Sequence, residues 1–199
     1  MREDDPHAAP LAVVVRRALE EAGAVVEPIL YDNLLDQAAF ERGVLRDVER
    51  LLASHQPASV TFVGKSLGTR ALGIICRKVQ PPKDTRLVWL TPVWEWDDAW
   101  AAAQAAPWPS LYVVGLDDHR YHRPDRHAAM DGETVAIQGA DHRLEVPGDI
   151  VATLDSWRAT AQAVLTFTTR TAHGAAVAED PAPTLTQPDD PKAGPSLPP

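Results

Sequence analysis

The sequence is poor in the features that mark several large classes of protein. It holds one cysteine, Cys76, so no disulfide can form within the chain. Only 19 basic residues stand against 28 acidic ones, and a net charge of -9 disfavours nucleic acid as a partner. No apolar run is long enough to span a bilayer, and the first residues lack the basic and then apolar pattern of a secretory signal. We therefore expect a cytoplasmic protein without a membrane or nucleic-acid partner.

What is present fits one domain with an ordinary core, since 45% of the 199 residues are hydrophobic. Apolar residues at helical spacing predict helices over 8–22, 37–54 and 149–167, and a further helix that starts after Ser66 and ends before Pro81. Short apolar runs predict five strands, at 24–31, 60–63, 87–90, 111–114 and 134–137. Strands that alternate with helices indicate an α/β fold, with a mostly parallel sheet and helices on both faces.

The end of the chain changes in character after residue 170. The last predicted helix is expected to bury a face made of Ile150, Val151, Leu154, Trp157, Ala161, Val164 and Leu165. Seven of the last 19 residues are proline, and aromatic residues are absent from 171–199. We therefore predict a domain over 1–170 and a disordered, dispensable tail over 171–199.

The sharpest motif is Gly64-Lys65-Ser66-Leu67-Gly68, which follows the strand at 60–63 and opens a helix. It matches G-x-S-x-G, in which a serine sits on a turn too tight for side chains two positions away, and both glycines are expected to supply that space. The backbone N–H of Leu67 is expected to point into an oxyanion site. The alternative interpretation is a purely structural Gly-rich turn. A phosphate-binding loop is excluded, because it needs glycine where Ser59 stands.

A serine nucleophile requires a base, and the base requires a carboxylate that orients it. The strand at 111–114 runs into Gly115-Leu116-Asp117-Asp118, which offers two carboxylates at a strand end. The strand at 134–137 is followed by Gly139-Ala140-Asp141-His142, which offers the base. The chain order Ser, Asp, His is the order found in α/β hydrolases.

Two of these segments resemble small dienelactone-hydrolase-like α/β hydrolases, and the resemblance covers about residues 8–167. The segment 115–118 resembles the family's G-x-x-D, whose last residue is the triad acid, which selects Asp118. The segment 139–145 resembles the family's G-A-D-H-x-L-E histidine loop. The resemblance implies a Ser66–Asp118–His142 triad that hydrolyses a small ester, thioester or similar acyl substrate, with no metal or other cofactor.

Several other residues have a structural interpretation beside a functional one. The loop at 117–127 is rich in His and Asp but lacks a fixed ligand spacing, so a solvated loop is favoured over a metal site. Lys65 either meets an anionic substrate or is simply exposed, and Cys76 is expected to be an inert core thiol. Four tryptophans either wall a substrate pocket or pack a helix on the sheet: Trp94, Trp96, Trp100 and Trp108.

The sequence departs from the family before its first helix. The family has strands there, and a Gly-rich loop that supplies a second oxyanion N–H. The absent strand would lie between those at 24–31 and 60–63, which are expected to pair directly or to leave a gap. An open edge would favour a homodimer, and a chain extended upstream is expected to be more stable and more active. The alternative function is a catalytically weak or inactive binding protein of the same fold, and a donor within residues 1–10 would distinguish the two.

Overall fold

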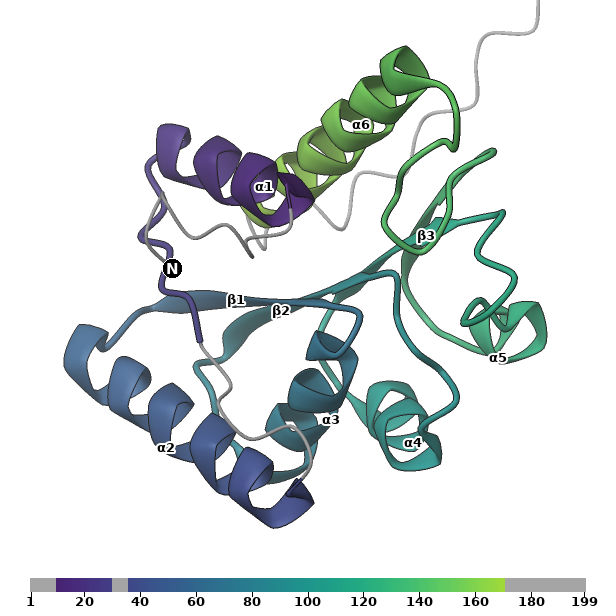
Figure 1. Ribbon diagram of the computed structural model, residues 1–199. Coiled ribbons are helices and arrows are strands. Elements are labelled where there is room, and N and C mark those ends of the chain that lie inside the picture. Colours follow the sequence, from purple (N-terminus) through teal and green to yellow (C-terminus); the bar gives the residue numbers. More distant parts are fainter. Residues whose placement is uncertain (1–9, 30–35, 171–199) are drawn as a thin grey trace, which may run out of the picture.

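Four parallel strands form the sheet at the centre of the computed structural model, which describes residues 10–29 and 36–170 (Figure 1). The spatial order of the strands is the chain order: β1 (Ser59–Lys65), β2 (Asp84–Leu90), β3 (Ser110–Gly115) and β4 (Glu133–Ile137). Each strand is parallel to its neighbour. The predicted α/β fold with a parallel sheet is therefore confirmed.

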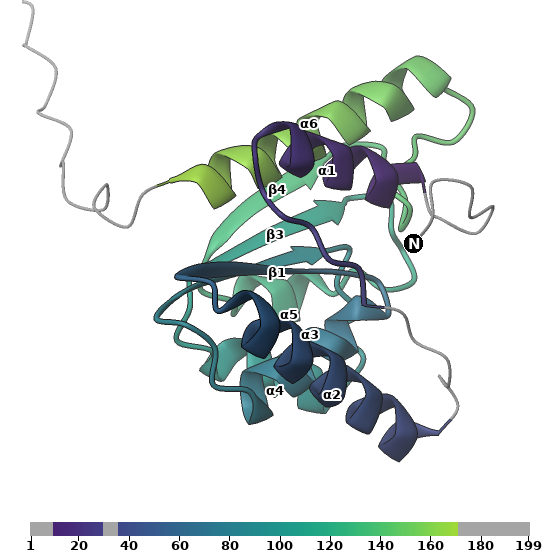
Figure 2. The same ribbon diagram turned by 90° about the vertical axis from the view of Figure 1, so that its left-hand side faces the viewer.

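Helices cover both faces of the sheet (Figures 1 and 2). One face carries α1 (Pro10–Glu21) and α6 (Ile150–Thr169), which pack against each other. The other face carries α2 (Gln37–His55), α3 (Gly68–Lys78), α4 (Asp97–Ala105) and α5 (Pro124–Ala128). Of these helices, α4 and α5 were not among those predicted from the sequence. No helix within the described ranges is long and apolar enough to cross a membrane.

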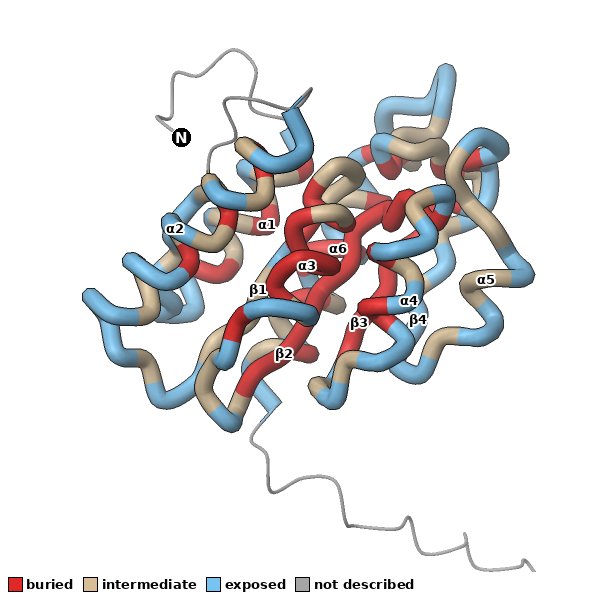
Figure 3. The backbone as a smooth tube through the Cα atoms, turned by 90° about the horizontal axis from the view of Figure 1, so that it is seen from below, coloured by how far each residue is buried: buried red, intermediate tan, exposed pale blue. Residues whose placement is uncertain are grey.

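The sheet separates two hydrophobic cores, because successive side chains of a strand point to opposite faces. On β2, Leu87 and Trp89 belong to one core, and Val88 and Leu90 belong to the other. The α2/α3 core also contains Phe40, Val44, Val48, Leu72, Ile75, Trp94 and Tyr112. The α1/α6 core also contains Leu11, Val15, Leu111, Val113, Leu144, Val164 and Phe167. Figure 3 shows β2 and β3 buried between helices whose outer faces are exposed.

Gly23 caps the end of α1. This residue has a φ of +88°, which glycine adopts without strain. Its N–H donates to the Glu20 carbonyl at 2.9 Å, and the Ala24 N–H donates to the Leu19 carbonyl at 3.0 Å. This pair of bonds is a Schellman motif, which satisfies the last carbonyls of the helix.

The strand predicted over 24–31 is wrong for residues 24–29, which form no strand, and residues 30 and 31 lie outside the described residues. This segment crosses the β1 edge from the α1 side of the sheet to the α2 side (Figure 2). Val26 packs on the α1/α6 core and Ile29 packs on the α2/α3 core. A strand requires a hydrogen-bonded neighbour, and within the described sheet β1 is an edge strand with no partner on this side.

The face predicted for α6 is wrong over its first turns. Ile150, Val151 and Leu154 are 69%, 66% and 55% exposed. Thr153 and Ser156 are buried in their place. Their hydroxyls bond the backbone of the loop after β4: Thr153 Oγ1 accepts from the Val146 N–H at 2.9 Å, and Ser156 Oγ donates to the Leu144 carbonyl at 2.8 Å. The inner face of this part of α6 is polar because it supports a loop backbone rather than the sheet.

The aromatic residues around α4 favour packing over a pocket wall. Trp94 is fully buried, with its ring centroid 5.5 Å from that of Trp89. Trp100 and Trp108 are partly buried against the same α2/α3 core. Cys76 also packs on this core, and burial raises the pKa of its thiol to about 12, which agrees with the predicted inert thiol.

Candidate active site

Ser66 occupies the turn between β1 and α3. Its φ is +52°, a left-handed conformation that non-glycine residues rarely adopt. The Ser66 N–H donates to the Leu90 carbonyl at 3.0 Å, and the Ser66 carbonyl accepts from the Thr69 N–H at 2.9 Å. These bonds fix the turn between the neighbouring strand β2 and the first turn of α3, and they hold the serine at the carboxyl end of the sheet.

The two glycines of the motif are not equivalent. A Cβ at Gly64 would lie 2.7 Å from the Gly68 carbonyl oxygen and 2.8 Å from the Leu72 side chain, so this position requires glycine. A Cβ at Gly68 would meet no described atom within 4 Å. The expectation that both glycines supply space is therefore wrong for Gly68, because this residue begins α3 with its Cβ direction open.

Gly115 brings the second and third segments of the site together. A Cβ at this position would lie 2.3 Å from the Ala140 carbonyl oxygen and 2.4 Å from that of Asp141. The loop after β4 therefore rests directly on the end of β3, and the Asp117 N–H donates to the Ala140 carbonyl at 2.9 Å. This close approach places the residues after β3 beside His142.

Asp141 shapes the turn that carries His142. Its Oδ1 accepts from the Arg143 N–H at 2.7 Å and from the Glu145 N–H at 3.1 Å. Its backbone N–H donates to the Glu145 carbonyl at 2.8 Å. Leu144 has a φ of +61° within this turn and is fully buried in the α1/α6 core. The side chain of Asp141 thus stabilises the backbone of the loop that carries His142.

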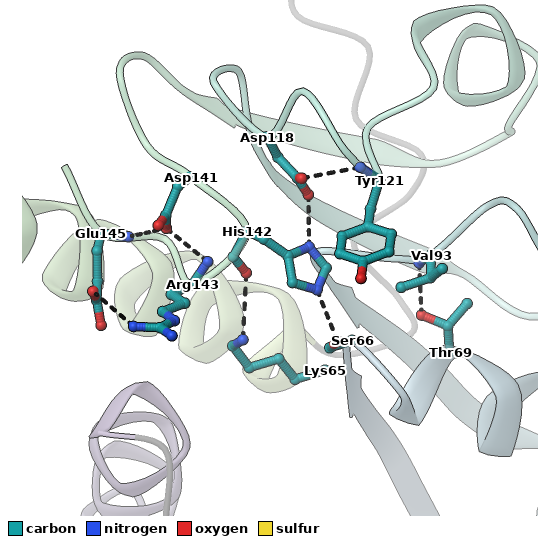
Figure 4. A network of polar contacts seen from close by, with 10 residues as sticks. All are labelled: Lys65, Ser66, Thr69, Val93, Asp118, Tyr121, Asp141, His142, Arg143 and Glu145. Atoms are coloured by element: carbon teal, nitrogen blue, oxygen red, sulfur yellow. Dashed lines mark hydrogen bonds and ion pairs between the residues drawn. The ribbon is translucent and has the colours of Figure 1, made fainter. Parts of the chain in front are cut away.

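The structure brings Ser66, His142 and Asp118 into one hydrogen-bonded chain (Figure 4). The distance from His142 Nε2 to Ser66 Oγ is 2.7 Å, and the distance from His142 Nδ1 to Asp118 Oδ2 is 2.6 Å. These partners assign the tautomer: Nδ1–H donates to the carboxylate, and Nε2 accepts from the serine hydroxyl. The Asp118 side chain is 5% exposed and that of His142 is 21% exposed, so the chain runs from the interior to the surface.

The carboxylate of the neighbouring Asp117 does not bond the imidazole of His142. Asp117 is exposed, and its backbone rather than its side chain contacts the histidine loop. Of the two carboxylates that the sequence offers at this strand end, the structure places Asp118 on the imidazole.

The predicted oxyanion donor, Leu67, follows Ser66 and precedes the first residue of α3. Its backbone N–H makes no hydrogen bond to another described residue, which leaves it available to a ligand. Pro10 has no N–H to donate, and the other residues named as a source of a second donor, 1–9, lie outside the described residues.

Lys65 lies half-buried beside the hydrogen-bonded Ser66–His142–Asp118 chain. The sequence analysis did not predict this position for its side chain. Its Nζ donates to the His142 carbonyl oxygen at 3.4 Å, so it ties the end of β1 to the histidine loop (Figure 4). Burial lowers the pKa of this amine, while the nearby carboxylate of Asp141 raises it. The contact of Lys65 with the His142 loop could not be predicted from the G-x-S-x-G motif, because the motif accepts any residue at position 65.

The loop rich in His and Asp is partly helical. Helix α5 begins at Pro124, which suits the first position of a helix. Within the part of the chain that the structure describes, no group of three or more His, Cys, Asp or Glu side chains is placed to hold a metal ion. The rings of His122 and His127 lie 5.9 Å apart, and His127 Nε2 is 3.1 Å from the hydroxyl of Thr134.

Comparison with known proteins finds likeness in structure and none in sequence. No protein-family model matches the chain, and no curated protein matches it significantly. An α/β serine hydrolase homologue from Coxiella burnetii is 16% identical, with a TM-score of 0.56 over 79% of this chain and 77% of that one. The esterase domain of a Rhodothermus marinus protein is 15% identical, with a TM-score of 0.55 over 77% and 78%. A bromoperoxidase from Bacillus anthracis is 14% identical, with a TM-score of 0.56 over 83% and 89%. At such identities the likeness shows the fold: this chain has the α/β-hydrolase fold.

Proposed function

We propose that this protein is a serine hydrolase that cleaves a small ester, thioester or similar acyl substrate. The observation that carries the proposal is the hydrogen-bonded chain from Ser66 through His142 to the buried carboxylate of Asp118, at the carboxyl ends of three parallel strands. The fold supports it, since esterase and hydrolase structures share this architecture.

In the proposed mechanism, Ser66 Oγ attacks the substrate carbonyl while His142 Nε2 takes its proton. Asp118 holds the Nδ1–H of the imidazole and stabilises the imidazolium that forms. The N–H of Leu67 donates to the developing oxyanion. His142 then gives its proton to the leaving group, and the same nitrogen activates the water that hydrolyses the acyl-enzyme.

A fluorophosphonate probe tests the nucleophile directly. We expect it to label the wild-type protein once, and we expect Ser66→Ala to abolish both labelling and the hydrolysis of short-chain aryl esters. Ser54 is a control, because its hydroxyl bonds the Leu51 carbonyl on α2, away from the site. Labelling that persists in Ser66→Ala, or that disappears in Ser54→Ala, would refute the proposed nucleophile.

The same experiment separates the hydrolase from a binding protein that keeps the fold. A hydrolase turns over at least one ester of the panel in a Ser66-dependent manner. A protein that is neither labelled nor active, while it melts cooperatively, would instead support the binding function.

A further inference from the structure

Tyr121 packs against the imidazole of His142 (Figure 4). The ring centroids are 4.4 Å apart, and the ring planes are inclined by 49°. Both imidazole nitrogens are already engaged, one by Asp118 and one by Ser66. The phenol ring adds a third contact, which restricts rotation of the imidazole out of line with the serine.

The same residue also holds the acid. The backbone N–H of Tyr121 donates to Asp118 Oδ1 at 3.1 Å, while Oδ2 accepts from His142 at 2.6 Å. Both carboxylate oxygens therefore have a donor, and the carboxylate cannot turn without losing a bond. Tyr121 thus contacts both members of the His–Asp pair, the acid with its backbone and the base with its ring.

An aromatic ring beside an imidazole interacts more favourably with the protonated form than with the neutral form, because a cation is attracted to the π face. Tyr121 therefore opposes the cost of charging His142. Its ring also lies 4.9 Å from the guanidinium carbon of Arg120. Among the charged groups near His142, Asp118 bonds the imidazole and Lys65 bonds the His142 carbonyl oxygen. Asp141, Arg143 and Glu145 lie on the same loop as His142.

Building on the hydrolase function proposed above, we propose that Tyr121 is a positioning residue, which holds the His142 imidazole in line with Ser66 and stabilises its protonated form during acyl transfer. The contribution requires the aromatic ring and the backbone N–H of Tyr121. The phenol hydroxyl is not part of it.

Two variants separate the ring from the hydroxyl. Tyr121→Leu removes the ring and keeps apolar bulk and the backbone N–H, whereas Tyr121→Phe keeps the ring. We expect Tyr121→Leu to lower kcat for an aryl ester about three- to tenfold with KM within twofold, and to move the low-pH limb of the kcat/KM profile, which reports the base His142, to lower pH. Tyr121→Phe should stay within twofold of the wild type with an unchanged profile. Should the leucine variant not fold, Tyr121→Met replaces it.

An NMR titration makes the test independent of turnover. The imidazole resonance of His142, assigned by its loss in His142→Gln, should titrate at lower pH in Tyr121→Leu than in the wild type or Tyr121→Phe. The proposal would be overturned if His142 titrated at the same or a higher pH in Tyr121→Leu than in the wild type. It would also be overturned by a raised KM with unchanged kcat, since that result would mean that Tyr121 contacts the substrate instead of positioning His142. Failure of the hydrolase function shows in the absence of Ser66-dependent labelling, whereas this titration measures the ring contact in an inactive protein as well.

Discussion

Asp117 and Asp118 are chemically identical neighbours whose surroundings differ completely. Asp118 is buried and bonds His142, whereas Asp117 is exposed. Burial without a bonded partner would be costly for a carboxylate, and here the imidazole and the Tyr121 N–H satisfy it. The two residues are adjacent in the turn after β3, and this turn directs the Asp118 side chain to the interior and the Asp117 side chain to water.

We expect Asp118→Asn to lower kcat by about 10³- to 10⁴-fold, because an amide at this position favours the imidazole tautomer that cannot accept the serine proton. Asp117→Asn makes the same chemical change in an exposed side chain, so its rate should remain within twofold. Steady-state kinetics on an aryl ester measures both. If the two variants ranked in the opposite order, Asp118 would not be the orienting acid.

Lys65 couples stability to pH. Burial lowers its pKa from the usual 10.5, so between its folded value and 10.5 the unfolded chain binds more protons than the native state. Stability rises with pH wherever the unfolded state binds more protons. The contribution of Lys65 is therefore least favourable at low pH and improves as the pH approaches 10.5.

Lys65→Met removes this titration and keeps the length of the side chain. We expect the thermal midpoint of the wild type to gain on that of Lys65→Met as the pH rises through the alkaline range towards 10.5. Melting curves of both proteins over this range provide the measurement. Lys83 offers a control, since this exposed lysine lies just before the start of β2, and Lys83→Met should track the wild type. Parallel curves for wild type and Lys65→Met would show that the buried amine is not the cause.

At the scale of elements, the site depends on how closely the loop after β4 approaches the end of β3. We expect Gly115→Ala to destabilise the protein by about 1–3 kcal/mol and to reduce activity, because the new Cβ would overlap the Ala140 and Asp141 carbonyl oxygens. Gly68→Ala is the stability control, since its Cβ meets no described atom within 4 Å. Chemical denaturation compares the two, and an equal loss of stability in both would contradict the role of the close approach.

The four strands that the sequence predicts correctly each pair with a parallel neighbour. Every residue of β3 is buried, and a short apolar run before a turn is typical of such a strand. The run at 24–29 also contains Val25, Val26 and Ile29, yet it forms no strand because pairing depends on a neighbour that local sequence does not specify. For the same reason, hydrophobicity misplaced the inner face of α6, where hydroxyls bond a loop backbone.

In the candidate site, too, the residues in local motifs could be predicted from the sequence, and those that reach the site by tertiary packing could not. Ser66, Asp118 and His142 lie in short motifs at strand ends, and parallel strands bring their carboxyl ends to one edge, so these three residues could be predicted. Lys65 and Tyr121 reach His142 by tertiary packing, from a position that the motif leaves free and from an irregular loop. No spacing in the sequence encodes those contacts.

For the whole molecule, the two cores share the strands that divide them. β2 contributes Trp89 to the α2/α3 core and Val88 to the α1/α6 core, and both side chains are fully buried. Neither core can lose its packing without exposing one face of the same strands. A cavity in either core should therefore lower the stability of the entire domain.

We expect the domain to unfold in one transition that different probes report identically. Tryptophan fluorescence reports mainly the α2/α3 core, because Trp89 and Trp94 lie in it and Trp100 and Trp108 pack against it, whereas far-UV circular dichroism reports the helices of both faces. The two curves should coincide in urea for the wild type. They should still coincide for Val44→Ala in the α2/α3 core and for Val164→Ala in the α1/α6 core, each destabilised by roughly 1–3 kcal/mol, because both side chains are fully buried. If the α1/α6 layer could unfold separately, Val164→Ala would shift the circular dichroism curve to lower urea more than the fluorescence curve, to which only Trp157 of that layer contributes, and the shared sheet would not couple the two cores.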